Sequence, residues 1–352
     1  MIATFAPIPS VILAFFLGVM SSTAWSCQPD QTCRQEMVYG DRVLDYVETR
    51  VGRTLEALEQ LIVVIHGQQG SATSALKVGS GVAEKMSLPN TALVLAPQFI
   101  EKAPQAPELS GKLFWWGRSS WRGGDLSYEK GAIRVSSFEI LDDLLERYLS
   151  KDKMPRLKTV ILLGHSAGGQ YVQRYAAGTD IDKRFPSIRF VFGVANPSTY
   201  LYLNSQRPTL GSEVTFSVPT ESRCQWNAGH FGLDARNEYF ARIPIDELRR
   251  SFINRTVIYA LGTKDNDPQH HQLSRSICAQ LQGAHRLERG ENYFRHLGVF
   301  FPEHRHTLVR VKGVGHHASR MFLSDEFMGH LASVLHDDTK IIGVLAPPKQ
   351  TP

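Results

Sequence analysis

The fold of this chain is constrained most strongly by residues 159–169, whose sequence is TVILLGHSAGG. The run from Thr159 to Leu163 is apolar or β-branched and predicts a buried strand, and the residues from Gln170 to Ala177 have helical character. Between them lies a segment of small residues around Ser166 that fits the pattern G-x-S-x-G. A sharp strand-to-helix turn holds a serine in a strained backbone conformation with its Oγ exposed. The segment therefore predicts a nucleophilic serine at the carboxyl end of a sheet, although the pentapeptide alone also fits an ordinary turn.

A candidate acid follows a second predicted strand, from Arg255 to Leu261. The loop after this strand runs from Gly262 through Asp265, and a carboxylate there can accept the Nδ1–H of a histidine and fix its tautomer. We expect Asp265 to have this role, with Asp267 as the main alternative. Because Gly, Asp and Asn are common turn formers, the loop also has a purely structural interpretation.

A candidate general base follows the last predicted strand, Thr307 to Val311, which alternates like an edge or penultimate strand. The next loop ends in Gly315 and carries His316 and His317. A histidine after the last strand can reach back to the serine as general base, and we prefer His316 because it directly follows the glycine turn. Adjacent histidines can also bind a metal, but the chain has no H-E-x-x-H and no paired C-x-x-C. We therefore expect neither a metal nor an organic cofactor.

The order Ser166, Asp265, His316 along the chain is the order found in α/β-hydrolases, and the chain resembles that superfamily from about Val38 to Val344. The segments that carry the resemblance are GHSAGGQ at 164–170, VANPS at 194–198, GTKD at 262–265 and GVGH at 313–316. A narrower likeness is to secreted esterase-like hydrolases, some of them polyhydroxyalkanoate-depolymerase-like. The resemblance implies an α/β fold: a mostly parallel central sheet with helices on both faces and an insertion before the acid-bearing strand.

Two backbone N–H groups are candidates for an oxyanion hole. The apolar run from Gln60 to Ile65 predicts a buried central strand, and it ends in the loop HGQQG at 66–70. Acyl transfer needs two donors, one from the residue after the nucleophile and one from a loop after an early strand. We expect these to be the N–H groups of Ala167 and Gln68. The alternative for the loop is a glycine-rich turn without a chemical role.

The remaining predicted elements alternate between strands and helices, which is typical of a parallel sheet covered on both faces. We expect two short strands in 37–51, helices at 74–86, 136–149 and 318–335, further strands at 91–96 and 188–194, and a long loop at 97–128.

These features predict a secreted serine hydrolase that cleaves small or polymeric carboxylic esters through an acyl-enzyme on Ser166. Amide or peptide hydrolysis by the same triad is one alternative, since the motif does not separate the two bonds. A non-catalytic binding protein on the same scaffold is another, and its function would lie in the loop FWWGRSSW at 114–121. There Trp115, Trp116 and Trp121 either line a substrate pocket or pack the loop.

The domain organisation is predicted to be simple. The apolar run from Val11 to Met20 is too short to span a bilayer comfortably, and small residues precede Cys27, so we expect residues 1–26 to be a signal peptide. A retained anchor and a lipidated Cys27 are the alternatives. Residues 27–36 follow as a polar leader and 37–345 as one hydrolase domain, in which 197–250 forms either a lid or a static insertion. We therefore expect a secreted or periplasmic protein without stable membrane insertion after processing.

The cysteine content agrees with an exported protein, and the charge bears on nucleic-acid binding. The chain has four cysteines, which allow three pairings, and we expect Cys27–Cys33 and Cys224–Cys278. The formal net charge is only +5 and the basic residues are scattered, so we expect no nucleic-acid partner. The oligomeric state is left open by the sequence.

Overall fold

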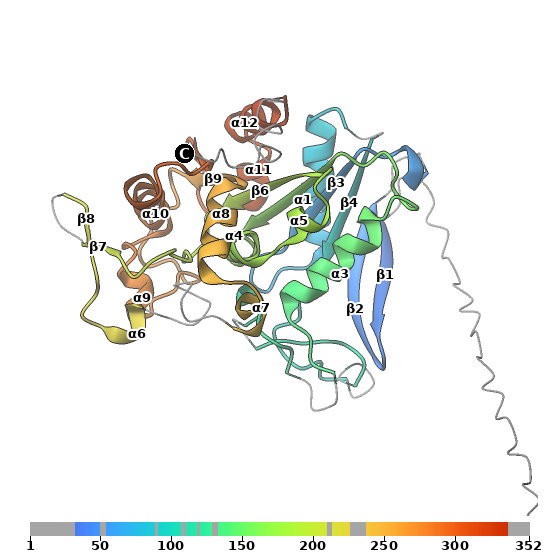
Figure 1. The fold of residues 1–352 in the computed structure, drawn as a ribbon, viewed down its shortest axis with the longest axis horizontal. Coiled ribbons are helices and arrows are strands. Elements are labelled where there is room, and N and C mark those ends of the chain that lie inside the picture. Colours follow the sequence, from blue (N-terminus) through green and yellow to red (C-terminus); the bar gives the residue numbers. More distant parts are fainter. Residues whose placement is uncertain are drawn as a thin grey trace, which may run out of the picture.

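A single mixed sheet forms the centre of the molecule, a computed structural model (Figure 1) that describes residues 32–49, 54–88, 91–106, 109, 111–117, 120–128, 133–209, 213–225 and 237–336. Its strand order is β1-β2-β4-β3-β5-β6-β9-β10. The strands are β1 (Thr32–Tyr39), β2 (Arg42–Thr49), β3 (Gln60–Ile65), β4 (Ala92–Pro97), β5 (Thr159–His165), β6 (Arg189–Ala195), β9 (Thr256–Gly262) and β10 (Thr307–Val311). β1 and β2 pair antiparallel with their neighbours and all other pairs are parallel, so the carboxyl ends of β3, β5, β6, β9 and β10 share one edge.

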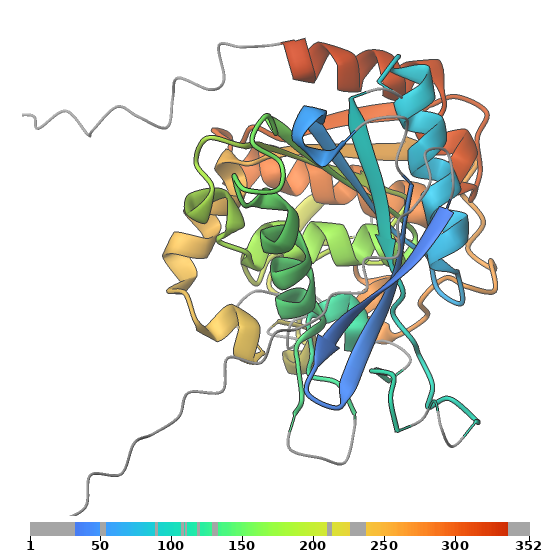
Figure 2. The ribbon, with the colours of Figure 1, turned by 90° about the vertical axis from the view of Figure 1, so that its right-hand side faces the viewer.

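Helices cover both faces of the sheet, as Figures 1 and 2 show from two directions. One face carries α1 (Ala72–Lys85), α11 (Ala318–Phe322) and α12 (Asp325–His336), and the other carries α3 (Ser137–Leu149), α4 (Ala167–Gly178), α8 (Ile245–Asn254) and α10 (Arg286–Phe300). The central strands are apolar on both faces because each face lies against such a layer. Two hydrophobic clusters result, one on each side of the sheet. The predicted α/β architecture is therefore confirmed.

The segment between β6 and β9 contains short elements and no further strand of the central sheet among its described residues. These elements are β7 (Arg207–Thr209), β8 (Thr215–Ser217), α6 (Ser222–Gln225) and α7 (Glu238–Ala241), after which α8 leads into β9. The short helix α5 (Ile181–Arg184) lies before β6. The disulfide Cys224–Cys278, which is one of the two pairings predicted above, joins α6 to α9 (Ile277–Gln280). The second predicted pairing, Cys27–Cys33, involves Cys27, which lies outside the described part of the chain. Residues 226–236 of the predicted insertion also lie outside it.

Two sequence-based expectations need correction, and several elements were not predicted. Strand β1 begins at Thr32, so the second half of the predicted polar leader is an edge strand paired with β2. The predicted helix 318–335 is two helices, because the Ser324 Oγ accepts the N–H of Phe327 and starts a new one. Helix α10 was not predicted at all. The short elements η1 (Leu55–Ala57) and η2 (Ser120–Gly123) were also missed, and η2 lies within the predicted long loop.

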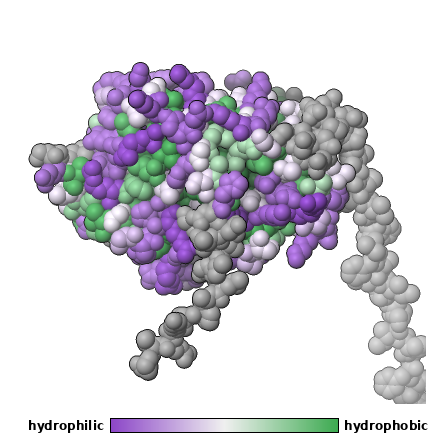
Figure 3. All heavy atoms as spheres, turned by 90° about the horizontal axis from the view of Figure 1, so that it is seen from above, coloured by the Kyte–Doolittle hydropathy of each residue, from purple (hydrophilic) through white to green (hydrophobic). Residues whose placement is uncertain are grey.

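The surface seen from above is mostly hydrophilic, with hydrophobic residues distributed among polar ones (Figure 3). The large exposed apolar side chains that the structure describes come from separate parts of the chain: Val38, Leu109, Tyr128, Val218, Ile277 and Val299. No helix within the described ranges combines the length and the apolar character that crossing a bilayer requires.

Candidate active site

The turn between β5 and α4 places Ser166 at the carboxyl edge of the sheet. Ser166 adopts φ +59° and ψ −117°, a strained backbone conformation, and its N–H donates to Ala195 O at 2.9 Å. The two flanking glycines permit this turn because there is no room for a side chain. A Cβ on Gly164 would lie 2.1 Å from Gly168 O, and one on Gly168 would lie 2.2 Å from Ile65 O. The local sequence therefore requires small residues where strand and helix cross.

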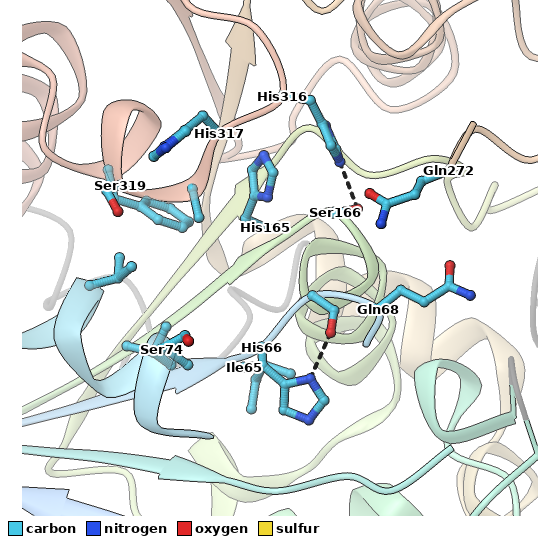
Figure 4. A pocket seen from close by; sticks show the side chains of 16 residues that line it. Ile65, His66, Gln68, Ser74, His165, Ser166, Gln272, His316, His317 and Ser319 are labelled. Atoms are coloured by element: carbon cyan, nitrogen blue, oxygen red, sulfur yellow. Dashed lines mark hydrogen bonds between the residues drawn. The ribbon is translucent and has the colours of Figure 1, made fainter. Parts of the chain in front are cut away.

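Three side chains from distant loops form one hydrogen-bonded chain at this edge. His316 Nδ1 lies 2.7 Å from Asp265 Oδ2, and His316 Nε2 lies 2.9 Å from Ser166 Oγ, the contact drawn in Figure 4. A carboxylate only accepts, so Nδ1 carries the proton and Nε2 accepts the serine hydroxyl. The structure thus brings together the three residues selected from the sequence, and the hydroxyl faces a ring nitrogen able to take its proton.

Asp265, and not Asp267, is the carboxylate beside His316. Asp265 is buried, whereas Asp267 is exposed and its Oδ1 accepts the N–H of Gln269 at 2.8 Å. Geometry therefore favours the first of the two candidates.

Asn196 holds together the loops that carry the acid and the histidine. It follows β6 with φ +44°, and its Oδ1 accepts the N–H of Gly262 at 2.9 Å at the end of β9. Its Nδ2 donates to Gly315 O at 3.3 Å, directly before His316. The segment VANPS at 194–198 thus has a structural role in the site that its sequence alone does not reveal.

Burial and charge set the proton affinity of His316. Burial lowers its pKa below the ordinary value of 6.5, the hydrogen bond that it donates to Asp265 raises the pKa, and the positive charge of Arg286 lowers it. The net direction is downward, so the ring is neutral at neutral pH and able to accept a proton. Arg286, at the start of α10, had not been selected from the sequence. The buried face of α10 is mostly polar, so an apolar period does not reveal this helix, and no sequence signal links its first residue to the acid loop.

Further histidines surround the ring of His316. The ring centroids of His165 and His270 lie 4.4 Å and 5.0 Å from that of His316, and His271 stacks on His270 at 4.7 Å. Burial is the main cause that lowers the pKa of both His165 and His270. Among the residues that the structure describes, no group of three or more His, Cys, Asp or Glu side chains is arranged to hold a metal ion.

The loop after β3 orients the N–H of Gln68. The N–H of Phe99 donates to His66 Nε2 at 3.0 Å, so the proton of His66 lies on Nδ1, which donates to Gly67 O at 2.7 Å. In a trans peptide the N–H points away from the carbonyl, so the N–H of Gln68 points away from the ring of His66. Neither this N–H nor that of Ala167, in the first turn of α4, donates a hydrogen bond within the described part of the chain.

A cavity of about 320 Å³ opens beside Ser166 (Figure 4). Its walls come from β3 and the following loop, α1, the serine turn, and the segment from His316 into α11. The lining residues are Val64, Ile65, His66, Gly67, Gln68, Ser74, Ala75, Val78, His165, Ser166, Gln272, His316, His317, Ala318, Ser319 and Phe322. Histidines apart, this lining contains no ionisable side chain, so the cavity offers apolar surface and neutral hydrogen-bonding groups.

None of the three tryptophans is among the residues that line this cavity. Trp116 and Trp121 are fully buried in the core on the α3 and α4 side of the sheet, and Trp121 stacks on Phe99 with centroids 5.4 Å apart. Trp115 is partly buried and stacks on Tyr128 at 5.3 Å. The loop packs because its aromatic side chains have core partners. Trp121 still contributes indirectly, since its ring packs against His66 at 5.1 Å behind the Gln68 loop.

Two solved structures resemble the chain over most of its length. Poly(aspartic acid) hydrolase-1 from Sphingomonas sp. KT-1 is 19% identical, with a TM-score of 0.55 over 88% of this chain and 99% of that one. A poly(3-hydroxybutyrate) depolymerase from Bordetella parapertussis is 20% identical, with a TM-score of 0.57 over 87% and 91%. No family model and no curated protein matches the chain. The strand order, the strained serine turn and these likenesses together identify the α/β-hydrolase fold.

Proposed function

We propose that the protein is a serine hydrolase that cleaves carboxylic esters through an acyl-enzyme on Ser166. The observation that carries the proposal is the hydrogen-bonded chain from Ser166 Oγ through His316 to Asp265. Ser166 Oγ attacks the ester carbonyl carbon while His316 Nε2 takes its proton. His316 then returns this proton to the leaving alkoxide. Water, activated by the same imidazole, releases the acid and regenerates the serine.

The oxyanion of each tetrahedral intermediate binds, in this proposal, to the backbone N–H groups of Gln68 and Ala167. Gln68 lines the cavity beside the nucleophile, and Ala167 directly follows Ser166 at the start of α4. Neither N–H has a hydrogen-bond acceptor within the described residues. Fixed donors of this kind stabilise charge that develops only in the transition state, at about 2.7–4 kcal/mol for each donor.

The cavity favours an uncharged acyl group. Apart from histidines its lining has no ionisable side chain, so a carboxylate on the acyl group would be buried without a cationic partner. This argues against a polyanion such as the poly(aspartic acid) for which one structural neighbour is named. An uncharged polyester such as poly(3-hydroxybutyrate), for which the other is named, or a small ester, fits the lining better. Amide hydrolysis by the same groups is the second candidate.

Replacing the nucleophile tests the proposal. We expect Ser166→Ala to lose covalent labelling by a fluorophosphonate and to lower kcat for p-nitrophenyl esters by about a million-fold, as removal of a triad nucleophile does elsewhere. Ser319→Ala is the matched control, because Ser319 lines the same cavity without bonding to His316, and it should label like the wild type. Wild-type protein that is neither labelled nor active on any ester or amide would overturn the proposal and favour a binding protein.

We also propose that the protein is exported after removal of residues 1–26, to the periplasm or the medium. The Cys224–Cys278 disulfide supports this, because disulfides persist in oxidising compartments. N-terminal sequencing of protein recovered from outside the cytoplasm should start at Cys27. Protein that retains Met1 and stays in the membrane fraction would show an uncleaved anchor instead.

A further inference from the structure

A buried arginine contacts the side of the candidate triad acid that faces away from the histidine. Arg286 Nη1 lies 3.4 Å from Asp265 Oδ1, and the two side chains are 0% and 2% exposed. The other carboxylate oxygen, Oδ2, accepts from His316 Nδ1 at 2.7 Å. The backbone N–H of Leu287, also in the first turn of α10, donates to Asp265 O at 3.1 Å. The start of this helix therefore holds both the backbone and the carboxylate of the acid.

The neighbouring Arg289 shows how differently Arg286 is bound. Arg289 is also buried, one turn further along α10, and it donates short hydrogen bonds to Gly283 O at 2.8 Å and Ser198 O at 2.7 Å. In contrast, Arg286 Nε and Nη2 are buried without a hydrogen-bond partner among the described residues. Burying a cation whose donors are not all satisfied is costly. Stability alone therefore does not explain why an arginine occupies position 286.

We propose, on the basis of the function proposed above, that Arg286 is a positioning residue of the triad. Its guanidinium donates a hydrogen bond to Asp265 Oδ1 and thereby keeps Oδ2 facing His316. Arg286 is not one of the residues that line the cavity, and the hydrogen bond that it donates within the triad goes to the acid, so we place its action at Asp265. With one donor on each oxygen the carboxylate cannot turn without breaking a bond. The hydrogen-bonded chain then extends over four residues, Arg286, Asp265, His316 and Ser166.

The charge of Arg286 has a second, measurable effect on the histidine. It lowers the pKa of His316, in addition to the larger effect of burial and against the effect of Asp265. The other titratable groups around this ring are histidines, and none of them is an anion that could offset the effect of Arg286 on the pKa of His316. They are His165, His270, His271 and His317. The reaction needs neutral His316, so activity rises with pH through this pKa. Losing the positive charge raises the pKa and moves the acid limb to higher pH.

The test measures the rate of fluorophosphonate labelling, and kcat/KM for p-nitrophenyl acetate, against pH in the mature enzyme. The wild-type acid limb should have its midpoint below pH 6.5. In Arg286→Met we expect the midpoint to rise by about one pH unit. The plateau rate should fall by about 10- to 100-fold, because the carboxylate is no longer held in place. Arg286→Gln removes the same charge, keeps a hydrogen-bond donor and gives the same readout if the Met variant does not fold.

Two controls separate this role from a structural one. Arg286→Lys retains the charge, so its acid limb should stay at the wild-type position while its plateau falls. Arg289→Met removes an equally buried arginine and should lower the melting temperature without moving the limb. An unchanged limb in both Arg286→Met and Arg286→Gln, or an equal displacement in Arg289→Met, overturns the inference. Failure of the proposed function is distinct, because the wild-type protein itself would then not be labelled.

Discussion

Replacing Asp265 with asparagine should lower kcat by about 10,000-fold, the loss seen when a triad acid becomes an amide. The amide NH₂ cannot accept the Nδ1–H of His316, so the imidazole adopts the other tautomer, with its proton on Nε2. Nε2 then no longer accepts the proton of Ser166. Steady-state hydrolysis of a p-nitrophenyl ester measures the loss. Fluorophosphonate labelling should slow in parallel, since it depends on the same proton transfer.

Asp267→Asn is the matched control, two residues away in the same loop. Its carboxylate is exposed and, among the described residues, accepts only the N–H of Gln269, so we expect kcat to stay within about twofold of the wild type. Asp265→Asn also leaves Arg286 buried without its ion-pair partner, which costs about 3–5 kcal/mol of stability. Circular dichroism at the assay temperature must therefore show that the variant is folded. A larger loss in Asp267→Asn than in folded Asp265→Asn would reverse the assignment of the acid.

The parts of the fold that could be predicted from sequence are those with a strong local signal. The predicted strand 60–65 coincides with β3, because a continuous apolar run between polar ends can only be buried. The helix 136–149 begins where Ser136 and Glu139 form a capping box. The positions of Ser166, Asp265 and His316 followed from the rule that parallel strands end at one edge, so three loops distant in sequence had to meet.

The sequence does not show which side chains contact one another in the folded protein. Three tryptophans in a loop at the ligand-binding edge suit a pocket or a core equally well, and only the positions of Phe99 and Tyr171 decide that Trp121 is buried. An arginine in a polar helical segment would be assigned to the surface by composition alone. Arg286 is buried because the acid lies beneath the first turn of α10, which is a property of tertiary packing.

Gly168→Ala should prevent folding or destabilise the protein by more than about 4 kcal/mol. The new Cβ would lie 2.2 Å from Ile65 O and 2.7 Å from His66 O, at the end of β3. Both are backbone atoms, and moving them displaces the loop that carries Gln68. The higher helix propensity of alanine contributes only about 1 kcal/mol in the opposite direction, so the clash dominates. Urea denaturation followed by circular dichroism measures the change in the free energy of unfolding, and soluble expression reports complete failure to fold.

Gly329→Ala separates this steric effect from the general effect of adding a methyl group to a helix. Gly329 lies on the exposed side of α12, and a Cβ there would meet no atom within 4 Å. The substitution should therefore stabilise the protein by about 0.5–1 kcal/mol, because alanine loses less backbone entropy than glycine on folding. If Gly168→Ala lowers the free energy of unfolding and Gly329→Ala raises it, two identical substitutions in helices have opposite effects on stability. This result would show that the close crossing of strand and helix at the nucleophile requires the glycine. A Gly168→Ala protein as stable and as readily labelled as the wild type would mean that β3 and α4 do not approach each other as closely as described.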